Sequence, residues 1–191
     1  MENHTGRNEK KEVASIEPTI TIFPYTIFLL TCRYNKVENI TTVGWVAPVC
    51  NDPPMFGIAL RNNRYSLELI QSAYKDGEAK FALNVSTHHM LEKVDYCGLF
   101  SGRKKKKSDV TGLTLIYSSE KAPPTIQESP LSIEFKVLSI NDLGSHSHIV
   151  GSLEKILANE SINPQDFVVA VEKQYFALEG PIGDCLKVWK K

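Results

Sequence analysis

The sequence predicts a mainly β fold, a Greek-key barrel of short strands with helices packed outside it. The first reason is that six or seven short runs of β-branched and aromatic residues are separated by turn signals. The second is that only two segments space their apolar residues as helices do, and these do not alternate regularly with the strands. That order argues against a doubly wound parallel sheet. A chain of 191 residues can bury a full core, and we expect one domain over 16–191 after a flexible N-terminus, 1–15.

The first half of the chain contains four expected strands and one helix. Asp52-Pro53-Pro54 introduces the third strand, because these residues favour turns. Ser66 is a suitable N-cap for the helix, and Asp76-Gly77 ends it. The expected elements are strands at Thr26–Arg33, Asn39–Val46, Met55–Leu60 and Ala79–Val85, and a helix from Ser66 to about Tyr74.

The second half contains one more helix and the remaining strands. Thr87 can cap this helix, and apolar residues at helical spacing follow it. Clean alternation from Leu131 to Val137 indicates a half-buried antiparallel strand. The other expected elements are a basic loop from Ser101, a strand at Leu113–Tyr117, a proline-rich connection over Lys121–Pro130, a turn at Asn141–Gly144, a long strand through Ser147 to Leu153, and a last strand at about Gln174–Leu178.

The charges balance overall but are unevenly distributed. The 22 Lys+Arg equal the 22 Asp+Glu, which argues against a surface that binds nucleic acid or a membrane as a whole. Arg103–Lys107 is five basic residues in a row, so the rest of the chain carries a net charge of −5. No apolar run approaches the ~20 residues of a membrane span. We therefore expect no nucleic-acid partner and no membrane partner.

The cysteines and the N-terminal region indicate a cytoplasmic protein. The four cysteines form no CxxC pair and have no zinc-like spacing, which is typical of thiols in a reducing compartment. Leu29-Leu30-Thr31-Cys32 loosely resembles a lipoprotein cleavage site, but acidic residues surround the supposed basic region and Pro24 interrupts the apolar run. We interpret this stretch as a buried strand.

Common catalytic signatures are absent from the sequence. It has no GxGxxG, Walker or HExxH motif, so dinucleotide, NTPase and zincin interpretations lack support. His146 and His148 share one face of an expected strand, and such a pair can hold a metal. Spacing identifies no third ligand, so we favour a hydrogen-bonding role and expect no metal site.

The basic run follows Ser101-Gly102 and allows three interpretations. It can be a solvated surface loop. It can be a nucleic-acid patch, which would need more basic residues and exposed aromatic residues elsewhere. It can also be a phosphate site, because a terminal phosphate needs a hydroxyl, an approachable backbone N–H and cationic donors.

A second polar cluster lies on one expected strand, where Asn39, Thr41 and Thr42 precede Gly44 and Trp45. A half-exposed strand of β-forming residues explains this pattern. The same amide and hydroxyl groups would also suit the edge of a planar heteroaromatic ring.

Two nearby features are compatible with the same ligand. Cys50–Pro54 forms a rigid loop whose backbone can reach a ring. Arg61 and Arg64 lie just before a helix N-terminus, which favours an anion.

Seven segments of the chain occur in a characteristic order. They are Asn39-x-Thr41-Thr42-x-x-Trp45, Pro48-Val49-Cys50-x-Asp52-Pro53-Pro54, Arg64-x-Ser66-x-x-Leu69-Ile70, Phe81-x-Leu83-Asn84-Val85, Cys97-Gly98-x-x-Ser101-Gly102-Arg103-Lys104, Leu143-Gly144-Ser145-His146 followed by Ile149-Val150-Gly151, and Tyr175-Phe176-Ala177-Leu178. Together they resemble the flavin reductase-like, FMN-binding split-barrel family, which includes flavoredoxins. The resemblance covers about Ile20 to Lys190.

The resemblance implies a six-stranded antiparallel Greek-key split barrel with flanking helices. It further implies a homodimer that binds FMN noncovalently near its interface, with the polar strand at the ring and ribityl chain and the basic run at the phosphate. Lys107 matches a lysine of the family, and His146 would lie near the flavin or where nicotinamide enters. With the two arginines before the helix, the expected cofactor-binding residues are Asn39, Thr41, Thr42, Trp45, Cys50, Arg61, Arg64, Ser101, Gly102, Arg103, Lys104 and Lys107.

Three functions are compatible with this pattern. The first is an FMN-dependent oxidoreductase that passes electrons from NADH or NADPH to free flavin or another acceptor. The second is a flavoredoxin-like carrier reduced by a partner protein. The third is a non-enzymatic FMN-binding protein, or one that has lost FMN and whose basic loop serves nucleic acid or an acidic partner. Because flavin carries the chemistry, we expect no catalytic side chain.

Overall fold

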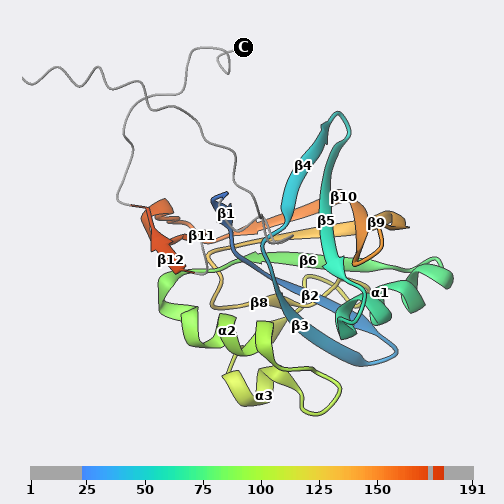
Figure 1. The fold of residues 1–191 in the computed structure, drawn as a ribbon, viewed down its shortest axis with the longest axis horizontal. Helices are drawn as coiled ribbons and strands as arrows, with labels where there is room; N and C mark the ends of the chain where they lie inside the picture. The colour runs from blue at the N-terminus through green and yellow to red at the C-terminus, as the bar shows by residue number, and fades with distance from the viewer. Residues whose placement is uncertain (1–22, 172–173, 179–191) are drawn as a thin grey trace, which may run out of the picture.

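A seven-stranded antiparallel sheet forms the centre of the protein, in the order β3-β2-β6-β9-β10-β5-β4 (Figure 1). The computed structural model describes residues 23–171 and 174–178, so the expected flexible segment 1–15 lies outside the described residues. Two small sheets, β1-β11-β12 and β7-β8, accompany the main one. The elements are β1 (Tyr25–Thr26), β2 (Phe28–Tyr34), β3 (Val37–Val43), β4 (Val46–Asn51), β5 (Pro54–Arg61), α1 (Tyr65–Lys75), β6 (Lys80–Val85), η1 (His88–Met90), α2 (Leu91–Leu99), α3 (Lys107–Thr111), β7 (Leu115–Ile116), β8 (Thr125–Ile126), β9 (Leu131–Asp142), β10 (His146–Ala158), η2 (Pro164–Asp166), β11 (Val168–Val171) and β12 (Gln174–Ala177).

The main sheet curls around one apolar core. β3 and β5 lie near opposite ends of the strand order, yet Val43 and Ile58 belong to the same buried cluster as Phe81 and Phe135 of the central strands. The predicted mainly β fold, an antiparallel split barrel, is therefore confirmed. The main sheet has seven strands where six were expected, because Val46–Asn51, for which no separate strand was expected, pairs with β5 as β4.

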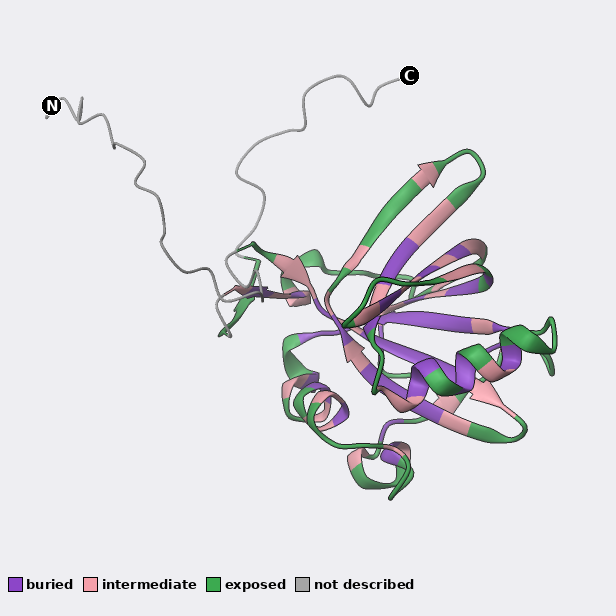
Figure 2. Ribbon diagram, turned by 45° about the vertical axis from the view of Figure 1, so that its right-hand side comes forward, coloured by how far each residue is buried: buried purple, intermediate pink, exposed green. Residues whose placement is uncertain are grey.

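Two helices cover opposite faces of β2 and β3. Side chains alternate along a strand, so Leu30 and Cys32 pack with the apolar face of α1, whereas Leu29 and Ile40 pack with that of α2. Figure 2 shows buried residues along the central strands and an exposed hairpin of β4 and β5 that stands out from them. The helices thus cover both faces of the sheet at β2 and β3, whereas the β4–β5 hairpin extends into solvent.

Several local predictions need correction. The strand expected at Thr26–Arg33 is divided at Ile27, because β1 pairs with β11 while β2 pairs with β3 and β6. The N-cap of α1 is Arg64, and Ser66 lies inside the first turn with its hydroxyl turned toward β3. Thr87 precedes a 3-10 turn, η1, before α2 begins.

The segment after the basic run also differs from its prediction. The expected loop contains a short helix, α3, which ends at Gly112 with a φ of 67°, a left-handed conformation that glycine adopts without strain. Residues 122–126 of the proline-rich connection are buried, and Asn84 accepts a hydrogen bond there from the Ile126 N–H and another from the Ser132 hydroxyl of β9. The last expected strand is confirmed as β12, and its partner β11 escaped prediction.

Candidate functional site

Two adjoining hollows lie where the ends of β3, α1, α2 and β10 meet, and Arg64 lines both of them. The large hollow has a volume of about 420 Å³ and the small hollow about 200 Å³. The large hollow is lined by Tyr25, Ile27, Thr42, Val43, Gly44, Trp45, Ala59, Leu60, Arg61, Arg64, Gly98, His146, Ala170 and Tyr175. The small hollow is lined by Asn39, Thr41, Asn63, Arg64, Tyr65, Leu99, Phe100, Ser101, Gly102, Arg103 and Lys107.

Aromatic side chains from four parts of the chain form the walls of the large hollow. Trp45 stacks on His146 with ring centroids 4.7 Å apart and an interplanar angle of 25°. Tyr175 of β12 donates its hydroxyl to Asp95 of α2, and β1 brings Tyr25 alongside by pairing with β11. The large hollow therefore offers flat apolar faces to a planar ligand.

The electrostatics of the large hollow favour a neutral imidazole. Burial, followed by the charges of Arg61 and Arg64, lowers the pKa of His146 below its ordinary value. Its Nδ1 lies 2.8 Å from the hydroxyl of Ser145. Burial and the hydrogen bond to Asp95 raise the pKa of Tyr175, so its hydroxyl keeps its proton.

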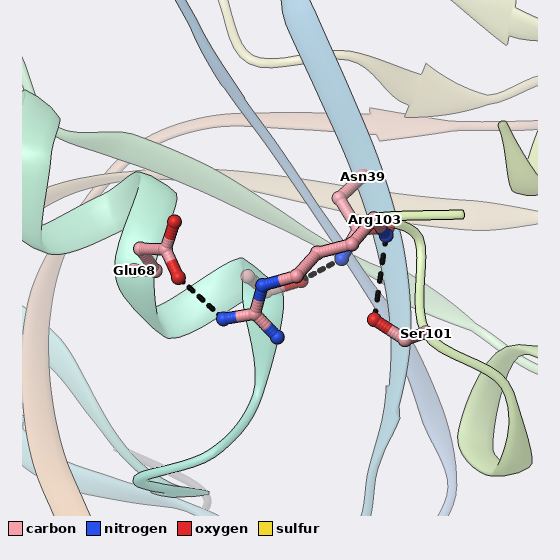
Figure 3. Close-up of polar contacts among 5 residues, drawn as sticks. Asn39, Glu68, Ser101 and Arg103 are labelled. Atoms are coloured by element: carbon pink, nitrogen blue, oxygen red, sulfur yellow. Dashed lines mark hydrogen bonds and ion pairs between the residues drawn. The ribbon is translucent and has the colours of Figure 1, made fainter. Parts of the chain in front are cut away.

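The small hollow is polar and carries the cations. Figure 3 shows Arg103 reaching back from the loop to form an ion pair with Glu68 of α1, while its backbone N–H donates to the Ser101 hydroxyl at 3.3 Å. The guanidinium of Arg103 also lies over the ring of Tyr65, 4.9 Å from its centroid. These contacts hold one guanidinium at the rim of the small hollow.

Gly102 and Asn39 lie against each other in the wall of the small hollow. A Cβ at position 102 would lie 2.0 Å from Asn39 Oδ1, so only glycine allows this approach. Asn39 donates through Nδ2 to the Ser66 hydroxyl at 2.8 Å (Figure 3). Its Oδ1 is buried and has no hydrogen-bond partner among the described residues. An unsatisfied buried acceptor of this kind is uncommon in a folded protein.

Arg64 connects the two hollows. Its Nη1 donates to the Gly98 carbonyl at 2.6 Å, which fixes the guanidinium to the end of α2. Burial, and next the charge of Arg61, lowers the pKa of Arg64 below its ordinary value. A bound anion would relieve both effects.

The five residues of the basic run have different environments. Lys107 is only 4% exposed, and its Nζ donates to the carbonyls of Ile40 and Cys97, each at 2.7 Å. Burial lowers its pKa to about 8. Lys106 pairs with Glu38 at 3.1 Å. With Arg103 paired to α1, Lys104, Lys105 and Lys107 have no ion pair among the described residues, and of these three only Lys104 and Lys105 are exposed.

The structure gathers most of the predicted site residues but not all of them. Cys50 lies on the β4–β5 hairpin, where its thiol donates to the Asp52 carbonyl at 3.4 Å, and it lines neither hollow. Lys104 is exposed and also lines neither hollow. Thr42, Trp45, Arg61, Arg64 and His146 meet at the large hollow, and Asn39, Thr41, Arg64, Ser101, Gly102, Arg103 and Lys107 meet at the small one.

Several lining residues were missed by the sequence analysis. Tyr25 carries no local signal, since it arrives through the packing of a distant element, whereas Tyr65 directly follows the predicted site residue Arg64. Tyr175 belongs to one of the segments that resemble the family, and its presence there together with Trp45 was the signal that could have found it. His148 lies outside the large hollow, against Gly57 of the neighbouring strand.

Comparison with known proteins agrees with this geometry. A model of the flavin reductase-like domain matches residues 20–179. The chain belongs to the flavin reductase-like domain family. This flavin reductase-like chain is 26% identical to flavoredoxin from Methanosarcina acetivorans, with a TM-score of 0.82 over 94% of this chain and 98% of that one. Flavoredoxin of Desulfovibrio vulgaris shares the fold, at 21% identity and a TM-score of 0.79 over 94% of this chain and 99% of its own.

Sequence comparison also finds relatives of this flavin reductase-like chain in archaea. An uncharacterised protein of Pyrococcus abyssi is 30% identical over 137 residues, which are 72% of this chain and 74% of that protein. Within the described residues of our chain, no helix combines the length and apolar character that crossing a membrane requires.

Proposed function

We propose that this flavin reductase-like chain binds FMN noncovalently and acts as an oxidoreductase that passes electrons from NADH or NADPH to free flavin or another acceptor. The single observation that carries the proposal is the pair of adjoining hollows joined at Arg64, one aromatic and one basic. FMN has the same two parts, a planar ring and a terminal phosphate, connected by a hydroxylated chain.

The residues of both hollows fit the three parts of FMN. The aromatic walls at Trp45 and Tyr175 suit the ring. The Ser101 hydroxyl, the backbone at Gly102 and the guanidinium of Arg103 suit the phosphate. The unpartnered Oδ1 of Asn39 suits a ligand that brings hydroxyl donors, as the ribityl chain does.

The protein would supply position, charge and exclusion of water, because the flavin itself accepts hydride and releases one or two electrons when it is bound. Trp45 and His146 would shield one face of the flavin ring from solvent, because their stacking fixes both side chains. Arg61 and Arg64 would place positive charge beside the ring, which favours a reduced, anionic ligand. His146 would remain a neutral hydrogen-bonding group at pH 7, since its lowered pKa keeps it unprotonated.

An apolar hollow of about 470 Å³ supports a homodimer as the assembled form. It shares Tyr25 and Trp45 with the large hollow, and continues onto the outer face of the hairpin at Val49, which is 51% exposed. Exposed apolar surface beside a ligand site favours an interface. We propose a cytoplasmic homodimer in which this face is covered by the second subunit. Sedimentation of wild type as a dimer and of Val49→Glu as a monomer would support this assembly, and a monomeric wild type would contradict it.

The activity can be tested on the purified protein. We expect a yellow protein, or one that takes up added FMN with one equivalent per chain. Under anaerobic conditions its flavin absorbance should bleach on addition of NADH or NADPH. A protein that takes up no FMN contradicts the proposal as a whole.

A flavoredoxin-like carrier is the second candidate, and the 26% identity to an archaeal flavoredoxin with nearly complete coverage favours it. The same experiment separates the two. FMN that stays oxidised with both nicotinamide nucleotides, but is reduced by dithionite, would contradict reduction by NADH or NADPH, agree with the carrier role and leave the binding proposal intact.

A further inference from the structure

Two short turns far apart in the sequence lie side by side away from the two hollows. η1 follows β6 and η2 precedes β11. An isolated antiparallel bridge joins Thr87 to Phe167, and the Val168 N–H donates to the Ser86 carbonyl at 3.3 Å. The backbone therefore fixes the distance between these turns.

This juxtaposition brings two imidazoles and a carboxylate together. His88, His89 and Asp166 each offer one ligand atom, and all of these atoms lie within 4.8 Å of one another. The two imidazole centroids are 3.8 Å apart, and His88 Nδ1 lies 3.8 Å from Asp166 Oδ1. The same carboxylate oxygen is partly fixed in place, because Asn163 Nδ2 donates to Asp166 Oδ1 at 3.3 Å.

The donor set selects a class of ion. Two nitrogen donors and one oxygen donor suit first-row divalent metals such as Zn²⁺, whereas Mg²⁺ and Ca²⁺ prefer oxygen donors alone. Ligands of a tetrahedral zinc ion lie about 3.4 Å apart, given Zn–N distances of about 2.1 Å. Both histidines are exposed, so rotation of their imidazoles can close the remaining gap without moving the backbone.

We propose that His88, His89 and Asp166 form a surface site for a first-row divalent transition-metal ion, with water completing its coordination. The simpler alternative is a pair of contacting imidazoles with a weak ion pair to Asp166. That alternative predicts no metal affinity above that of a chain without these side chains.

A metal ion bound at this site would stabilise strands that line the large hollow. A metal bridging η1 and η2 fastens the start of β11 to the end of β6. β11 contributes Ala170 to the large hollow, and its partner β12 contributes Tyr175. Metal binding should therefore stabilise the wall that these strands form, since a ligand that binds only the folded state raises its stability.

The test is Zn²⁺ binding to the full chain after treatment with a chelator. We expect one tight equivalent of Zn²⁺ in competition with a chromophoric chelator, no comparable binding of Mg²⁺, and a rise in melting temperature on adding Zn²⁺. His88→Asn, His89→Asn and Asp166→Asn should each weaken Zn²⁺ binding by about tenfold or more. His148→Asn is the matched control, because it removes an imidazole that lies in the apolar hollow and should leave Zn²⁺ affinity unchanged.

Two results would overturn the site. One is a wild-type chain that binds no Zn²⁺ in this competition. The other is an affinity that all three variants retain, which would place the ion on other residues. Circular dichroism of each metal-free variant separates loss of the site from loss of the fold.

Discussion

The indole of Trp45, which lies between β3 and β4, stacks on the imidazole of His146 at the start of β10, although 101 positions separate them. β5 brings them together: its Arg61 pairs with His146 at the start of β10, and the Ala59 N–H donates to the Trp45 carbonyl at 3.0 Å. Trp45 remains 42% exposed and lines the large hollow. It is therefore placed to report on whatever enters that hollow.

The first prediction concerns tryptophan fluorescence. The chain has two tryptophans, and only Trp45 lines the large hollow among the described residues. FMN bound there should strongly quench the fluorescence of Trp45, and Trp45→Phe should lose most of that quenching while it still binds FMN. The measurement is an emission titration of both proteins. Equal quenching in wild type and Trp45→Phe would show that the FMN ring does not bind in the large hollow.

The second prediction concerns the close contact at Gly102. In Gly102→Ala the new Cβ meets Asn39 Oδ1, so the loop must shift. We expect FMN affinity to fall by tenfold or more and the free energy of unfolding to fall by about 1–3 kcal/mol. Gly77→Ala is the control, because its Cβ meets nothing and its cost of about 1 kcal/mol comes from a φ of 75° alone. Similar FMN affinities in the two variants would remove Gly102 from the site.

The third prediction separates two positions of the basic run. Arg103 lines the small hollow, whereas Lys105 is exposed and lines neither hollow. Arg103→Ala should weaken FMN binding by about tenfold through loss of charge-assisted hydrogen bonds. Lys105→Ala removes the same charge and should change the affinity by less than about twofold. Direct titration of both variants with FMN measures the two affinities. Equal losses of affinity would show that net charge alone attracts the ligand.

The fourth prediction follows from the buried amine of Lys107. Its pKa of about 8 in the folded chain lies below that of an unfolded lysine, so the unfolded chain binds more protons above pH 8 and stability rises with pH. Relative to Lys107→Met, the free energy of unfolding of the wild type should rise by about 1 kcal/mol between pH 7 and pH 9. Urea unfolding at these pH values measures it, and parallel pH profiles of the two proteins would contradict it.

Two buried thiols should limit this gain above pH 9. Burial raises the pKa of Cys32 to about 12 and that of Cys97 to about 11. The folded chain then holds protons that the unfolded thiols have lost, so stability falls as pH rises beyond 9. Stability should accordingly reach its maximum near pH 9 in the wild type and decline above pH 9 in both proteins.

The sequence predicted the polar side of the site better than its aromatic side. Asn39, Thr41 and Ser101 stand in local patterns whose chemistry is visible without a fold. Tyr25 and Tyr175 meet only because β1, β11 and β12 form a small sheet, and no local pattern indicates pairing between residues as distant as Tyr25 and Ala170. Long-range pairing of this kind depends on tertiary packing rather than on propensity.

The basic run also shows what a local sequence pattern does not reveal, in this case the burial of a charged residue. Consecutive lysines indicate an exposed loop, and that holds for Lys104 and Lys105. Nothing local marks Lys107 as buried, because its partners are carbonyls of β3 and α2 that only the fold brings within reach. The local pattern likewise indicates β5 but not its partner β4, since the prolines of the hairpin hide the pairing of the two strands.

The ion pairs of Arg103 with Glu68 and of Lys106 with Glu38 determine how far the charge of the run extends. Each acidic partner cancels one cation at a distance, so these two pairs add little to the charge that a ligand meets from beyond the Debye length of about 8 Å. These two pairs should thus contribute little to the dependence of the ligand's association rate on ionic strength. Arg103 acts after contact, because the incoming phosphate competes with Glu68 for its guanidinium. Arg103 should therefore affect the dissociation rate of the ligand rather than its association rate.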